Sequence, residues 1–163
     1  MKKAVYTIFL ALILVVCLSG CGGSDSTAST TTEAPVVTTG GPIIVALSFP
    51  DGAPKLNSSS AFTCTITNNE AAARKMSVTI NAPENAFILE SGSLSWSGTV
   101  PGNSEKTVIE ATLKSNHTGH WQIDASYHID TEPDGFGGDF TATIYVNMGI
   151  PSSEWGTTPP WQK

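Results

Sequence analysis

The chain has 163 residues, of which 40% are apolar, 8% aromatic and 13% charged, which suits one globular domain with a sizeable core and excludes a multidomain enzyme. Fourteen acidic and eight basic residues give a formal net charge of -6, the wrong balance for neutralising phosphates, so we expect no nucleic-acid partner. Fifteen Gly and ten Pro indicate many turns and short strands, which argues against an all-helical protein.

Residues 1–20 have the parts of a secretory signal peptide. Lys2 and Lys3 precede a nearly unbroken apolar run of about fifteen residues that ends at Leu18. The run is shorter than the ~20 apolar residues that a membrane-spanning helix needs. We therefore expect a leader that is removed, rather than a permanent membrane span.

The leader ends in Leu18-Ser19-Gly20-Cys21, which closely resembles the lipobox of bacterial lipoproteins. The resemblance implies cleavage before Cys21, a diacylglycerol on the Cys21 sulfur, and an extracytoplasmic protein at the cell membrane or the cell surface. Such acyl chains contribute ~0.8 kcal/mol per buried CH₂ group, which exceeds what stable anchoring requires. The alternative is an ordinary signal peptide, which would leave a free thiol in an oxidising compartment.

Residues 21–40 comprise this cysteine and a Ser/Thr-rich tether. Nine of the seventeen residues from Ser24 to Gly40 are Ser or Thr, without apolar periodicity, so the segment cannot bury enough surface to fold. As a coil it would hold the following domain a root-mean-square ~25 Å from the lipid. A plain spacer and a site of O-glycosylation are both consistent with this composition.

Residues 41–149 alternate apolar and polar residues with period two, and Pro, Gly or Asn interrupts the pattern every eight to twelve residues. This pattern is typical of a β-sandwich or barrel. The predicted strands cover residues 42–49, 61–68, 75–82, 87–90, 93–100, 105–113, 120–130 and 140–148, of which 87–90 is a short extra edge strand. In the strand 105–113 we expect Thr107, Ile109, Ala111 and Leu113 to share one face. Seven or eight short strands predict an all-β, immunoglobulin-like antiparallel sandwich.

Four segments carry a family resemblance: FTCTITNN at 62–69, MSVTI at 76–80, VPGNS at 100–104 and GHWQIDA at 119–125. They look like the cell-adhesion-related immunoglobulin-like domains of bacterial and archaeal surface proteins. The resemblance covers roughly residues 42–148. It implies the fold and an envelope location, weakly implies adhesion or assembly, and brings no catalytic residues.

The residues able to carry chemistry do not form a catalytic set. Cys64 falls on the apolar face of its strand, where we expect a buried free thiol. His120 and His128 are ~26 Å apart along one strand, too far for a common metal. Neither paired carboxylates nor a Ser–His–Asp set can be placed, so we expect no enzyme.

An acidic segment follows the strand 120–130. Asp130, Glu132 and Asp134 fit the opening of a calcium loop, whose carboxylates alternate around the cation, but position twelve is Thr141 instead of Glu. Two interpretations stay open. One is a plain acidic hairpin loop; the other is a weak calcium site that uses these three carboxylates and Asp139.

Three aromatic residues are candidate partner contacts. Phe136 is expected at a hairpin tip, where an exposed aromatic is typical of binding. Trp155 and Trp161 belong to the Trp/Pro-rich tail, residues 150–163, which either folds back on the sandwich, stays loose or docks onto another protein. We predict a non-enzymatic, membrane-anchored envelope lipoprotein that serves in adhesion or structure or binds an envelope protein or polysaccharide. The alternative is a calcium- or carbohydrate-binding accessory module.

Overall fold

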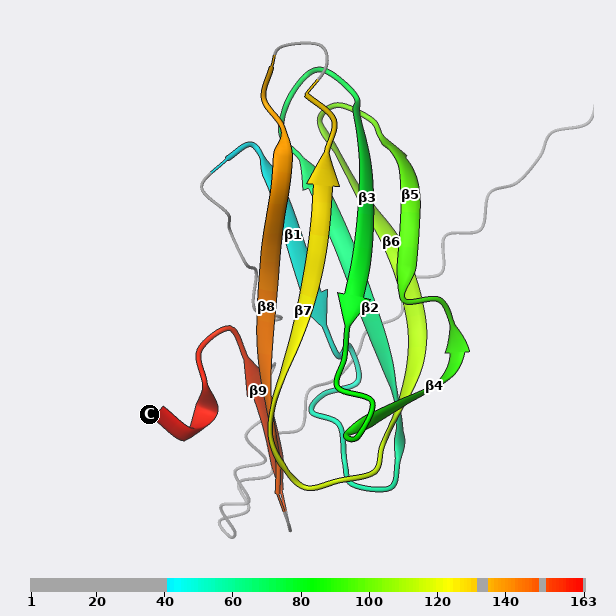
Figure 1. Ribbon diagram of the computed structural model, residues 1–163, viewed down its shortest axis with the longest axis vertical. Coiled ribbons are helices and arrows are strands. Elements are labelled where there is room, and N and C mark those ends of the chain that lie inside the picture. The colour runs from blue at the N-terminus through cyan, green and yellow to red at the C-terminus, as the bar shows by residue number, and fades with distance from the viewer. Residues whose placement is uncertain (1–40, 132–134, 150–151, 163) are drawn as a thin grey trace, which may run out of the picture. The chain divides into compact units, whose positions relative to one another are not determined.

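A computed structural model describes residues 41–131, 135–149 and 152–162. These residues form two antiparallel β-sheets packed face to face (Figure 1). The first sheet has the order β1 (Ile43–Ser48), β2 (Ser59–Asn68), β6 (Ser104–Ser115) and β4 (Phe87–Gly92). The second has the order β5 (Ser95–Val100), β3 (Arg74–Asn81), β7 (Gly119–Ile129), β8 (Gly138–Met148) and β9 (Ser153–Gly156), and the 3₁₀ turn η1 (Pro160–Gln162) follows. The predicted immunoglobulin-like β-sandwich is confirmed.

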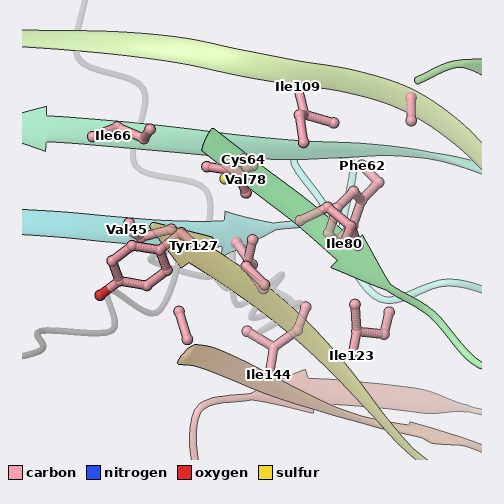
Figure 2. Close-up of a cluster of buried hydrophobic side chains, with 14 of the residues drawn as sticks. Val45, Phe62, Cys64, Ile66, Val78, Ile80, Ile109, Ile123, Tyr127 and Ile144 are labelled. Carbon is pink, nitrogen blue, oxygen red and sulfur yellow. The ribbon is translucent and has the colours of Figure 1, made fainter. Parts of the chain in front are cut away.

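The core lies between the two sheets, because every second residue of a strand points to the same side. Val45 and Cys64 come from the first sheet, and Val78, Ile123 and Ile144 from the second; Figure 2 shows all five in one buried cluster. Every buried apolar residue of this cluster lies between residues 43 and 148. The sandwich therefore supplies its whole core from residues that follow the predicted tether.

One strand departs from the predicted alternation. The register of β2 against β6 shifts after Cys64, which lies opposite Ile109, so that Thr65 lies opposite Thr107 and Val108 is the extra residue of a β-bulge. An added residue turns the following side chains to the other face. The prediction that Thr107 shares the inward face of Ile109 is wrong, because Thr107 is exposed and hydrogen-bonds the Thr65 hydroxyl at 3.1 Å.

The tail adds a strand that the sequence did not predict. β9 pairs antiparallel with β8 and places Trp155 opposite Val146. The Trp155 ring meets the ring of Phe49 edge-on, with 5.8 Å between centroids. Of the three alternatives for the tail, the structure shows the folded-back one for residues 152–162.

The two ends of the sandwich differ in what they carry. We call the end at which the chain enters β1 the proximal end. There the Asn69 N–H donates to the Pro42 carbonyl just before β1, and the β7–β8 connection lies at the same end. At the opposite end, which we call the distal end, Phe87 at the start of β4 lies opposite Ser115 at the end of β6. The proximal end is uppermost in Figure 1 and β4 lies in the distal half. No helix within the described ranges is long and apolar enough to cross a membrane.

Candidate functional site

A buried polar network holds the loops of the proximal end. The buried Asn68 side chain donates to the carbonyls of Ala72 and Pro101 at 2.9 and 3.1 Å, and accepts from the Glu70 N–H at 3.0 Å. One side chain thereby ties the β2–β3 loop to the β5–β6 turn. Because buried polar groups are costly when unpaired, these bonds fix both loops.

Phe136, a predicted partner contact, is part of this end. The buried Arg74 guanidinium pairs with the Glu70 carboxylate and donates to the Phe136 carbonyl at 3.4 Å. The same guanidinium lies 5.7 Å from the centroid of the Phe136 ring, which stacks on Phe140 at 6.2 Å. Phe136 is therefore partly buried against the core, and a partner contact there stays a prediction.

The predicted calcium site falls only partly within the described residues, since Glu132 and Asp134 lie outside them. Asp139 Oδ1 lies 2.8 Å from His128 Nδ1, while Asp130 lies 3.6 Å from both His128 Nε2 and Lys75 Nζ. Within the described ranges, no three His, Cys, Asp or Glu side chains are grouped to hold a metal. Both described carboxylates thus face nitrogen-bearing side chains, and calcium binding stays a prediction.

His128 also belongs to a row that resembles a catalytic set. Ser77, His128 and Asp139 are neighbours across β3, β7 and β8 and line a shallow hollow of about 330 Å³. A Ser–His–Asp mechanism needs the imidazole to take the serine proton. Here the second imidazole nitrogen faces Asp130, and no hydrogen bond joins Ser77 to His128 in the part of the chain that the structure describes. The row lacks the contact that would activate a nucleophile.

Cys64 is the other nucleophilic candidate. It is a free, fully buried cysteine, and desolvation by burial raises the pKa of its thiol from 9.0 to about 12. The thiolate is the reactive form, so the thiol is inert at neutral pH. The expected role of Cys64 as a small apolar core residue is consistent with this position.

The two tail tryptophans have different surroundings. Trp155 is half-buried in β9, whereas Trp161 in η1 is 37% exposed. The Trp161 ring stacks on His120 at 4.2 Å with an interplanar angle of 3°, and meets Tyr145 edge-on at 5.8 Å. Trp161 therefore lies over the outer face of the second sheet. Partner binding by either tryptophan stays a prediction.

One apolar hollow in the described part of the chain was not predicted from the sequence. Beside β3, β4 and β6, where the chain crosses from the second sheet to the first and back, lies a hollow of about 550 Å³ that we call the edge groove. Its large apolar lining residues are Ile80, Phe87, Ile88, Leu89, Leu94 and Leu113. Ile88 and Leu89 are 47% and 43% exposed. The sequence did contain one sign of this exposed apolar surface: Ile88 and Leu89 are adjacent in an edge strand, so they cannot both face the core.

Comparisons with known proteins support the fold. No family model matches the sequence, and no curated protein is significantly similar to it. Alpha-2-macroglobulin from Escherichia coli, from domain MG7 to the C-terminus, superimposes with a TM-score of 0.53 at 17% identity, over 71% of this chain and 16% of that one. The GAE domain of GGA2p from Saccharomyces cerevisiae has a TM-score of 0.52 at 12% identity, over 69% of this chain and 96% of that one.

A second E. coli alpha-2-macroglobulin structure, activated by trypsin, has a TM-score of 0.54 at 18% identity and covers 71% of this chain and 7% of that one. The chain thus spans a small part of the macroglobulin chains. At these identities the likeness defines the class of fold: an all-β protein built on an immunoglobulin-like β-sandwich.

Proposed function

We propose that the chain is a membrane-anchored envelope lipoprotein whose sandwich is a non-enzymatic protein-binding module. The main support for this proposal is that the point of chain entry and the edge groove lie at opposite parts of the sandwich. The chain joins the sandwich at the proximal end, beside Pro42, whereas the edge groove lies in the distal half. A lipid on Cys21 would tether the sandwich through its proximal end, so that the point of attachment would leave the groove free.

The dimensions support such a display. The eleven residues of β7 extend over ~35 Å at 3.2–3.4 Å per residue. The nineteen residues between Cys21 and Gly41 add a root-mean-square ~25 Å if they form a coil. The groove would then be presented beyond the lipid headgroups to other envelope proteins.

The side chains that could perform catalysis support a non-enzymatic role. The Cys64 thiol is buried with a raised pKa, and His128 lies between two carboxylates. A binding role needs only a stable scaffold and an exposed surface, both of which the sandwich provides. Calcium or carbohydrate binding remains the sequence-based alternative.

The anchor is tested by expressing the full chain in a bacterium that is fed an alkyne-tagged palmitate. We expect the wild-type protein to incorporate the tag, to sediment with membranes and to be digested by protease added to intact cells or spheroplasts. Cys21→Ala should lose the tag and the membrane association. Cys64→Ala, the matched control, should retain both. A tag retained in Cys21→Ala, or a wild-type protein in the soluble fraction, would contradict the proposal.

A further inference from the structure

β4 is the last strand of the first sheet and pairs only with β6 among the described strands. The outer edge of such a strand presents N–H and C=O groups that can pair with another extended chain. Its residues after Phe87 are all exposed. β4 is therefore able to accept an added strand.

Proteins usually protect such edges with charges, bulges or covering side chains. The other edge strand, β5, carries such side chains, because the Trp96 ring lies close to Gly98 and the Lys106 ammonium lies 5.1 Å from that ring. β4 has a bulge after Leu89, yet Ile88 and Leu89 expose their apolar side chains beside it. An exposed apolar edge is expected where a partner covers it.

The edge groove provides a place for the side chains of an added strand. Its walls are mainly apolar, and Glu84 is the only charged residue that lines it. The nearby Glu90 carboxylate already accepts from the Ser59 hydroxyl and lies 3.9 Å from Lys114 Nζ. Glu84 is exposed and has no ion pair among the described residues. The groove thus combines apolar walls with one unneutralised negative charge.

We propose that the edge groove binds an extended segment of a partner protein, which adds to β4 as a further strand. Its alternate apolar side chains enter the groove, and a Lys or Arg faces Glu84. This proposal rests on the protein-binding role proposed above, for which it specifies an extended partner segment with alternate apolar side chains and a basic residue. A second copy of this chain fits less well, because it is also acidic and brings its own Glu84. A lipid surface fits less well, because Glu84 would repel anionic headgroups.

The test uses residues 22–163, which contain the entire buried core, and three probe peptides of eight residues. The first has the sequence Lys-(Val-Thr)₃-Lys, the second replaces both Lys by Glu, and the third replaces the central Val by Pro. We expect saturable binding of the first peptide, with amide shifts in ¹⁵N spectra confined to β4 and the groove. The second and third peptides should bind at least about fivefold more weakly, because one repels Glu84 and the other cannot complete the strand.

Variants assign the binding to the groove. The double variant Ile88→Thr with Leu89→Thr keeps β-forming residues and should weaken binding at least about tenfold. Trp161→Thr, the other exposed large apolar residue, should leave binding unchanged. Glu84→Lys should abolish the preference for the Lys peptide, while Glu105→Lys, on an exposed site opposite Thr67 at the proximal end, should retain it.

Four outcomes would overturn the proposal. They are the absence of saturable binding, amide shifts on the outer face of the second sheet, a dimer in sedimentation that the double variant dissociates, and binding to phosphatidylcholine–phosphatidylglycerol vesicles that the same variant abolishes. If one of them is observed while Cys21 is lipidated, the proposed groove partner is wrong and the proposed lipid anchor stands. If Cys21 is not lipidated but the groove binds the peptide, the anchor is wrong and the groove partner stands.

Discussion

Arg74 shows how one residue can organise an end of a sandwich. Its guanidinium is fully buried, and the Glu70 carboxylate and the Phe136 carbonyl are among its partners. A buried pair contributes little compared with an apolar pair of the same size, but leaving one charge without its partner is costly. The loops of the proximal end therefore depend on both members.

We predict that Glu70→Gln lowers the free energy of unfolding by about 2–4 kcal/mol, because it removes the carboxylate charge that pairs with the buried Arg74 cation. Lys75→Gln, which removes the solvent-exposed partner of Asp130, should cost less than about 0.5 kcal/mol. Urea unfolding followed by tryptophan fluorescence measures both. Equal losses of unfolding free energy in the two variants would show that the buried ion pair contributes no more to stability than the exposed one.

Cys64 gives a prediction about alkaline pH. Its folded-state pKa is raised by burial from 9.0 to about 12, so the folded protein keeps a proton that the unfolded chain releases. This contribution to stability is complete below about pH 9 and is lost as pH rises toward 12. At pH 11 the loss is about 2–3 kcal/mol. Cys64→Ala should show a correspondingly shallower decline in unfolding free energy between pH 9 and pH 11, and parallel declines would refute the assignment.

At the scale of elements, the β5–β6 turn is fitted closely to the β2–β3 loop. A Cβ on Gly102 would lie 2.0 Å from the Ala71 carbonyl oxygen, and the Asn103 N–H donates to the Glu70 carbonyl at 2.7 Å. We predict that Gly102→Ala destabilises the sandwich by more than about 2 kcal/mol, because backbone has to move. Gly156→Ala, whose added Cβ would lie 3.7 Å from its nearest neighbour, should be within about 0.5 kcal/mol of wild type in the same urea assay.

β9 should stabilise the sheet through Trp155. This ring packs on Phe49, whereas Trp161 lies outside on His120 and Tyr145. We predict that Trp155→Ala lowers the free energy of unfolding by about 2–3 kcal/mol and Trp161→Ala by less than about 1 kcal/mol. The loss increases with the apolar surface that each ring buries. Thermal melting compares the two. A larger loss for Trp161→Ala would mean that η1, and not β9, secures the tail.

The strands could be predicted to the extent that they obey period two. β7 alternates without interruption, and its prediction was within one residue at each end. Thr107 was misplaced because a bulge leaves no mark in composition, and β9 was missed because four residues are too few to show a period. The buried role of Arg74 could not be seen, because the Phe136 carbonyl that accepts from its guanidinium lies 62 residues further along the chain.

For the whole molecule, the sequence predicts where the chain is attached, and the structure shows an apolar groove in the half of the sandwich opposite the end at which the chain enters it. The Cys21 motif is local and can be recognised in a few residues. The edge groove depends on two crossings between sheets, which no single segment encodes. Attachment at the proximal end and a groove in the distal half together make the anchored binding module the function that fits best.

The proposed lipid anchor is tested by the mass of the N-terminal peptide of the protein extracted from bacterial membranes. We predict a chain that begins at Cys21 and carries a diacylglyceryl group on the sulfur. A chain that retains residues 1–20, or one that begins elsewhere with an unmodified Cys21 thiol, would contradict it.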